Sequence, residues 1–219
     1  MKLIGMMDSP YVRRVAVSLA LYGVEFESLP LSVFSGFDEF SRINPVVKAP
    51  TVVLDNGTQL MDSTLILHYF ETTNPAGRRL LPTHPEALAR DLHLLGVILA
   101  ACEKAVQHVY EHRLRPEEKQ HQPWIARVTG QLLAACREWD ARLADRVAAA
   151  QPDQVLVTST VVWSFIQLMI PAVVSAAEFP HIRALAEKGE ALPAFQQYPL
   201  GAQAHHRAVG LAFHDDRFE

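Results

Sequence analysis

The first thirty residues carry the pattern that most restricts the fold: an apolar run, a capped helix start and a second apolar run. Residues 2–6 are mostly apolar and of strand length. Ser9 followed by Pro10 is typical of an N-cap with proline at the first helical position, and apolar residues then recur at three- and four-residue spacing as far as Tyr22. Residues 24–29 alternate apolar and polar side chains, which predicts another strand. Two strands joined through one helix make a βαβ unit, so we expect parallel strands and a right-handed crossover.

The residues that follow predict a short helix, a β-hairpin and a further amphipathic helix. The short helix is expected over residues 37–43. Pro50 is expected to open the third strand, where a missing N–H is tolerated. Asn56-Gly57 between two apolar runs is a strong hairpin signal. We therefore predict an α/β N-terminal domain over residues 1–75, with a four-stranded mixed sheet and helices on its faces.

Beyond this domain the sequence changes character. Residues 76–86 lie in a proline-rich stretch without periodicity, which indicates a linker, and residues 87–219 give no defensible strand signal. Helices are expected over residues 86–113, 124–150, 153–170, 178–188 and 192–198. The helix at 124–150 should direct Trp139 and Val147 inward, whereas the helix at 153–170 is apolar nearly all round and should be the central buried one. We predict an all-α C-terminal domain.

Composition narrows the possible partners and compartments. About half of the 219 residues are hydrophobic (49%) and the net charge is −4, which supports a large core and argues against nucleic acid or an anionic membrane as a main partner. The longest apolar stretch, residues 155–177, is interrupted by polar residues, and no signal-peptide pattern is seen. Cys102 and Cys136 have no CxxC spacing, so a reduced cytoplasm is expected. His108 and His112 lack carboxylate or cysteine partners at ligand spacing, so no metal site is expected.

Three short sequence motifs of the N-terminal domain are informative through their order and spacing. They are Ser9-Pro10-Tyr11-x-Arg13-x-Val15, Asn44-Pro45-x-x-Lys48-Ala49-Pro50 and Asp62-Ser63-x-x-Ile66-x-x-Tyr69. The set resembles the cytosolic glutathione S-transferase family, and most closely its bacterial branch with serine at the thiol-contacting position. The resemblance implies a thioredoxin-like glutathione-binding domain followed by a helical domain, glutathione as co-substrate, no metal and a homodimer.

Part of the implied glutathione site is the loop before the third strand. Pro50 would be a cis-proline, which leaves the backbone N–H and C=O of Ala49 to pair with the cysteine of glutathione as a short strand would. From the residues alone, a trans proline at a strand start is the alternative. Lys48 would pair with the glycyl carboxylate; otherwise it is a solvated surface charge.

A second part is the dipeptide Asp62-Ser63 before the next helix. Ser63 and the open N–H groups of that helix would hold the γ-glutamyl carboxylate, because helix N-termini bind anions. Asp62 would face the γ-glutamyl ammonium, at a position where the family more often has glutamate. The alternative for Asp62 is a plain N-cap.

Ser9 is the residue to which the resemblance assigns chemistry. The thiolate is the nucleophile, yet a free cysteine thiol has a pKa of about 8.5 and is little ionised at neutral pH. A hydroxyl that donates to the sulfur, together with the positive end of the first helix, would favour the charged form. Lowering the thiol pKa by roughly two units takes about 2.7 kcal/mol. The alternative is an ordinary capped helix without a ligand.

Four further residues are candidates for an apolar pocket that would accept the electrophile. They are Tyr11, Val106, Tyr110 and Phe165. Each has a core position as its alternative, and Tyr11 is also a possible second donor to the sulfur.

The sequence departs from the family at the start of the helix expected at 153–170. The family has serine or threonine there, with aspartate three residues later. Asp153 keeps a capping residue, but Leu156 stands at the third position, so the reciprocal bond is lost at a cost of about 1 kcal/mol.

Two function hypotheses follow. The first is a glutathione S-transferase that activates the glutathione thiol for attack on a small hydrophobic electrophile. The second is a catalytically weak, glutathione-transferase-like binding or interaction protein. The retained Ser9 and Asp62-Ser63 favour the first, and the shorter acidic side chain and the altered helix cap leave room for the second.

Overall fold

The structure of the chain is a computed structural model that describes residues 1–201, and it divides into two compact units. Among the described residues, the first unit contains Met1–Arg79 together with residues 193–201, and the second is Leu80–Leu192. The first unit thus takes in a late segment that our sequence-based division grouped with the helical domain. The tail from His205 to the C-terminus lies outside the described residues.

The first unit is built on a four-stranded mixed sheet with the strand order β2-β1-β3-β4. The strands are β1 (Lys2–Ile4), β2 (Glu27–Leu29), β3 (Thr51–Val53) and β4 (Gln59–Leu60). β1 pairs in parallel with β2 and antiparallel with β3, and β3 pairs antiparallel with β4. The predicted parallel pair and hairpin are therefore confirmed, and Pro50 immediately precedes β3 as expected.

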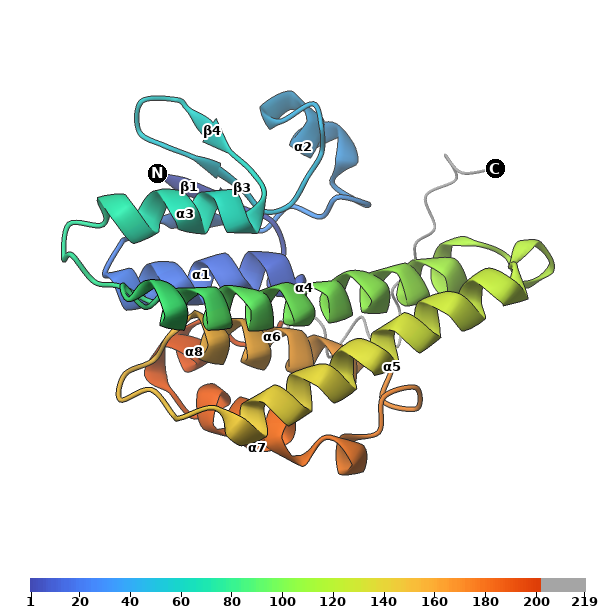
Figure 1. The fold of residues 1–219 in the computed structure, drawn as a ribbon. Coiled ribbons are helices and arrows are strands. Elements are labelled where there is room, and N and C mark those ends of the chain that lie inside the picture. Colours follow the sequence, from blue (N-terminus) through green and yellow to red (C-terminus); the bar gives the residue numbers. More distant parts are fainter. Residues whose placement is uncertain (202–219) are drawn as a thin grey trace. The chain divides into compact units, whose positions relative to one another are not determined.

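In the described part of the first unit the sheet is joined by four helices: α1 (Pro10–Tyr22), α2 (Phe37–Ile43), α3 (Ser63–Thr73) and the short α8 (Pro193–Gln197). Figure 1 shows α1 and α3 side by side, with α2 away from both. α8 packs on α1 through Arg13, which is fully buried. The Arg13 guanidinium lies 5.4 Å from the centroid of the Phe195 ring, and its Nε donates to the Tyr198 carbonyl at 2.8 Å. These two contacts fasten the late segment to α1.

The second predicted strand is shorter than its alternating pattern indicated. Gly23 ends α1 in the left-handed conformation (φ 72°), and the Val24 N–H donates to the Leu19 carbonyl at 2.9 Å. Val24 thus completes the helix C-terminus, as in a Schellman motif, and is not available for pairing. The prediction of a strand over residues 24–26 was wrong for this reason.

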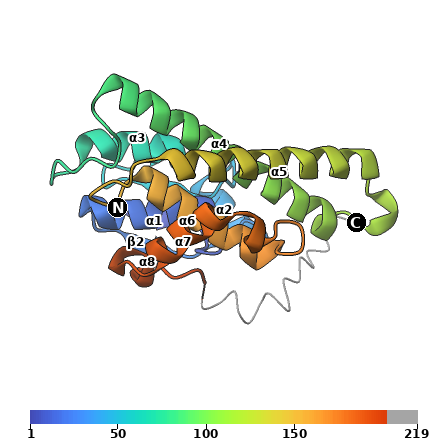
Figure 2. The same ribbon diagram turned by 60° about the horizontal axis from the view of Figure 1, so that its bottom comes forward.

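The regular elements of the second unit, Leu80–Leu192, are all helical, and the structure describes this whole range. They are α4 (Pro85–Leu114), α5 (Gln122–Asp145), α6 (Gln154–Met169) and α7 (Pro180–Glu190), with 3-10 turns at Glu117–Lys119 and Ala176–Glu178. α4 and α5 run alongside each other, as Figures 1 and 2 show. The all-α prediction is confirmed for this range, and α6 is buried along most of its length as expected.

Trp139 anchors the core of the second unit. Its indole Nε1 donates to the Ser159 hydroxyl at 3.1 Å, and its ring meets Trp163 edge-on at 6.3 Å between centroids. The predicted inward position of Trp139 is confirmed, because the side chain is fully buried. The same prediction for Val147 was wrong: α5 ends at Asp145, and Val147 is 89% exposed.

Arg146, the C-cap residue of α5, joins three segments of the second unit. Its guanidinium contacts Asp91 of α4 at 2.9 Å and Asp153 at 2.7 Å. Burial lowers the pKa of Arg146, but the hydrogen bonds that its guanidinium donates to the two aspartates outweigh this effect, and the net pKa is raised. Asp153 also caps α6, since its Oδ1 accepts from the Leu156 N–H at 2.9 Å. Asp153, whose cap lacks the usual reciprocal hydrogen bond, is thus also held by a tertiary ion pair with Arg146.

α4 is the one helix among the described residues that is long and apolar enough to cross a membrane, by length and composition only. We had expected residues 155–177 to come closest, but their helix α6 is shorter. One such helix is weak evidence of a membrane span, since core helices of soluble proteins pass the same test. The inward face of α4, which includes Leu95 and Ile98, is buried.

Candidate active site

The first turn of α1 presents the Ser9 hydroxyl. Ser9 has extended backbone angles (φ −74°, ψ 122°), and its Oγ accepts from the Val12 N–H at 3.4 Å, with Pro10 at the first helical position. A hydroxyl has one donor proton and two acceptor lone pairs. Capping the helix uses a lone pair and leaves the proton to be donated elsewhere, so the cap and the thiol contact are compatible in one geometry.

Gly5 brings the Ala49-Pro50 loop next to this turn. The pairing of Ile4 with Thr51 places Gly5 at the end of β1, where the loop enters β3. A Cβ added to Gly5 would lie 3.1 Å from the Cβ of Ala49 and 2.5 Å from a methyl carbon of Val12. The Ala49–Pro50 peptide bond is cis, so the expectation that came with the resemblance is confirmed.

Replacing Gly5 with alanine should therefore destabilise the first unit by about 3 kcal/mol, from overpacking and an unfavourable positive φ. Gly5 has φ 140°. Gly57→Ala is the matched control, because Gly57 also has a positive φ (84°) but no heavy atom would lie within 4 Å of its added Cβ. Urea unfolding followed by circular dichroism measures both. Equal losses in the two variants would contradict the close approach.

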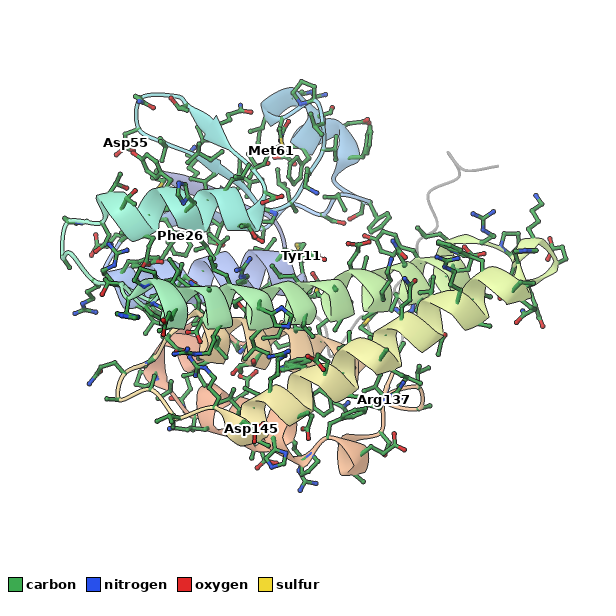
Figure 3. The ribbon with its side chains drawn as sticks, viewed as in Figure 1. Tyr11, Phe26, Asp55, Met61, Arg137 and Asp145 are labelled. Carbon is green, nitrogen blue, oxygen red and sulfur yellow. The ribbon has the colours of Figure 1, made fainter. Side chains whose placement is uncertain are left out.

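Asn44 holds the same loop to the end of the sheet. It is 2% exposed, and its side-chain amide donates to the Thr51 hydroxyl at 2.9 Å and to the Met61 sulfur at 3.2 Å. The Thr51 hydroxyl donates in turn to the Lys48 carbonyl at 2.6 Å, whereas the Lys48 side chain is exposed. Figure 3 labels Met61 where β4 leads into α3. Asn44 thus couples the second motif to the third.

Asp62 begins α3 as its N-cap. Its Oδ1 accepts from the N–H groups of Thr64 at 2.9 Å and Leu65 at 3.2 Å, and the side chain is exposed. The peptide bond between Met61 and Asp62 is cis. We had expected the first N–H groups of this helix to be open to a ligand. That was wrong for Thr64 and Leu65, whose N–H groups the Asp62 carboxylate occupies.

Ser63, the first residue of α3, is 3% exposed and contacts an arginine of α1. Arg14 Nη1 donates to the Ser63 hydroxyl at 3.2 Å and to the Thr64 hydroxyl at 3.0 Å. Sequence reasoning did not include Arg14 in the site. Its signal was present, because two successive arginines, Arg13 and Arg14, interrupt the apolar stripe of a helix that the pattern buries.

The candidate pocket residues lie in different environments. Phe165 of α6 is 7% exposed, Val106 of α4 is half-buried and Tyr110 is 40% exposed. Tyr11 is half-buried in the first turn of α1, where Figure 3 labels it. Tyr11 belongs to the first unit and the other three belong to the second. The burial of Phe165 fits its core alternative, and the pocket stays a prediction.

His108, His112 and Cys136 have local contacts or burial that are typical of structural residues. The His108 and His112 rings stack at 4.3 Å, and burial together with the neighbouring His112 lowers the pKa of His108. Burial raises the pKa of the Cys136 thiol to about 12, which keeps it protonated and unreactive. Within residues 1–201, no group of three or more His, Cys, Asp or Glu side chains is placed to hold a metal ion.

Comparison with known proteins finds similarity to glutathione S-transferases. Residues 3–78 match the sequence profile of the glutathione S-transferase N-terminal domain. A glutathione S-transferase of Methylobacterium radiotolerans, crystallised with glutathione sulfonate, superposes with a TM-score of 0.84 at 26% identity and covers 92% of this chain and 95% of that one. Over residues 3–78 the chain thus resembles the N-terminal domain of glutathione S-transferases. The mixed sheet of the first unit is that of a thioredoxin-like domain, and the predicted fold class is confirmed.

Two further proteins are similar to this chain. A Pseudomonas fluorescens Pf-5 glutathione transferase family member with bound glutathione has a TM-score of 0.77 at 25% identity, over 91% of this chain and 98% of that one. The uncharacterized GST-like protein YibF of Escherichia coli K12 is 32% identical over 130 residues, which are 54% of this chain and 64% of YibF. The chain thus spans less than two thirds of the length of this sequence relative.

Proposed function

We propose that the protein is a glutathione S-transferase in which Ser9 activates the glutathione thiol for attack on a small hydrophobic electrophile. The observation that carries this proposal is the geometry of Ser9, whose Oγ accepts from the Val12 N–H and so keeps its proton for a ligand. Accepting one hydrogen bond also polarises a hydroxyl and strengthens the bond that it donates. The start of α1 adds the positive end of a helix dipole at the same place.

The proposed chemistry is stabilisation of a thiolate and not covalent catalysis by the protein. The Ser9 O–H donates to the sulfur anion, which then attacks the electrophile. A charge-assisted hydrogen bond and a helix N-terminus together are of the right size to supply the required stabilisation of about 2.7 kcal/mol.

The rest of glutathione would lie along the segments that meet at α1. The backbone of Ala49 would pair with the cysteine of the tripeptide, and Lys48, exposed beside it, would pair with the glycyl carboxylate. Ser63 would bind the γ-glutamyl carboxylate, and Asp62 its ammonium. The close approach of Gly5 to Ala49 supports this arrangement, as do the glutathione ligands of two structurally similar proteins.

Retention on immobilised glutathione followed by a conjugation assay with a general electrophile tests the proposal. We expect retention, elution by free glutathione and measurable turnover. Retention without turnover would favour the second hypothesis, a catalytically weak glutathione-binding protein. If the protein is not retained and shows no turnover, the proposed glutathione site is ruled out.

The implied cytoplasmic location and the homodimer belong to the same proposal. Leu65 and Tyr69 stand one turn apart on α3 and are 59% and 38% exposed, and neighbouring exposed apolar side chains often mark an interface. We expect the protein to sediment as a dimer.

The variant Leu65→Glu/Tyr69→Glu should shift the sedimenting species towards the monomer, because it places charge in an apolar contact. His68→Glu is the matched control, since His68 is exposed on the same helix between these two residues. Analytical ultracentrifugation measures the change. A monomeric wild type, or an equal shift in the control, would contradict the α3 interface.

A further inference from the structure

The buried guanidinium of Arg14 constrains the hydroxyl groups at the start of α3. Arg14 is 4% exposed, and its Nη1 donates to both the Ser63 and the Thr64 hydroxyls. A guanidinium has only donors, so each hydroxyl that contacts it must accept. The proton of each hydroxyl therefore points away from Arg14.

Those two protons have no acceptor in the described part of the chain. Across residues 1–201, neither the Ser63 nor the Thr64 hydroxyl donates to a protein group. Ser63 is 3% exposed, and a buried hydroxyl with an unused donor is costly unless a ligand or water accepts from it. The contact with Arg14 thus leaves two donors ready for an anion.

The two hydroxyl donors matter because the start of α3 by itself offers an anion few other donors. The Asp62 carboxylate caps the same helix and takes the N–H groups of Thr64 and Leu65. An anion that binds next to Ser63 therefore meets a negative charge and fewer open N–H groups than a bare helix terminus offers. The Ser63 and Thr64 hydroxyls that Arg14 contacts supply donors at the point where those N–H groups are taken.

We propose that Arg14 is a positioning residue for glutathione: it orients the Ser63 and Thr64 hydroxyls to donate to the γ-glutamyl carboxylate. The inference rests on the proposed function and deepens it. It adds Thr64 as a second hydroxyl donor and gives Arg14 a role in recognition through these hydroxyls without direct contact with the ligand.

The test pairs one substitution with one change in the ligand. Glutathione is compared with its analogue in which 4-aminobutyrate replaces the γ-glutamyl residue, which removes only the α-carboxylate. For Arg14→Met we expect the Kd of glutathione to rise about tenfold, as for the loss of charge-assisted bonds, and the Kd of the analogue to stay within about twofold. Isothermal titration calorimetry on the full chain measures both.

Arg13→Met is the matched control, because Arg13 is the neighbouring buried arginine but contacts α8. It should change the melting temperature and leave the ratio of the two Kd values unaltered. Should Arg14→Met fail to fold, Thr64→Val replaces it, since Thr64 is exposed and the substitution removes only the hydroxyl that Arg14 orients. We expect this variant to weaken glutathione about threefold and the analogue not at all.

The outcomes separate this inference from the proposed function. An equal loss of affinity for both ligands, or no loss for either, would overturn the role of Arg14 while wild-type binding of glutathione stands. If the wild-type protein binds neither ligand, the proposed function itself fails, and the positioning role fails with it. Arg14→Lys keeps the charge and should recover part of the lost glutathione affinity.

Discussion

Ser9→Ala should lower kcat/KM for conjugation about 25-fold at pH 7, because a thiol whose pKa returns from about 6.5 to about 8.5 falls from roughly 76% to roughly 3% ionised there. The physical reason is that the substitution removes the proton that the Ser9 hydroxyl keeps for the sulfur after its Oγ has accepted from Val12. The loss should shrink as the pH rises from about 6.5 and largely vanish above about 8.5, because a free thiol ionises there without help. Steady-state kinetics over a range of pH measure both effects.

Ser9→Gly separates catalysis from helix capping. Alanine at an N-cap costs about 1 kcal/mol of stability, whereas glycine costs only roughly a few tenths of a kcal/mol. Both variants lack the hydroxyl, so we expect equal losses of activity but a lower melting temperature only for Ser9→Ala. Recovery of activity in Ser9→Gly would show that Ser9 is only a cap.

Arg146→Met should destabilise the second unit by about 3 kcal/mol, because it leaves two partly buried carboxylates without their shared cation. The side chains of Asp91 and Asp153 are 11% and 13% exposed, and both contact Arg146 Nη2 within 3 Å. Urea unfolding followed by tryptophan fluorescence measures the loss, since all three tryptophans lie in this unit.

Arg183→Met is the control for the loss of an arginine as such. Arg183 and Glu187 form an exposed pair at 3.9 Å, so this variant should change the stability by less than about 0.5 kcal/mol. Asp153→Asn keeps an N-cap and loses the ion pair, while Asp153→Ala should cost about 1 kcal/mol more. Equal effects of Arg146→Met and Arg183→Met would contradict a buried network.

Local signals explain what the sequence could predict. Ser9 before Pro10 marks the start of α1, Gly23 marks its end, and the Asn56-Gly57 pair marks the β3–β4 hairpin, because each residue acts through its own backbone preferences. The prediction of a strand at residues 24–26 failed for the same reason. An alternating pattern is a local signal, and it does not show that the backbone hydrogen bond which ends α1 competes with strand pairing.

Contacts between distant residues could not be predicted from the same patterns. Asp140 of α5 caps α7 by accepting from the N–H groups of His181 and Ile182, each at 2.9 Å. Nothing near Pro180 in the sequence indicates that cap. Arg14 is a similar case, since its partners on α3 lie 49 and 50 residues away and become visible only when the two helices are placed. The sequence motifs of the candidate site could thus be predicted, but the hydrogen bonds between distant residues of the site could not.

The ionisation of bound glutathione tests the central claim most directly. Thiolate absorbance in the ultraviolet, followed against pH for the complex with wild-type protein and with Ser9→Gly, gives the pKa of the sulfur in each. We expect the thiol in the wild-type complex to titrate roughly two units below the free thiol and the thiol in the variant to titrate close to it. A bound thiol that titrates at the same pH in both complexes would contradict activation by Ser9.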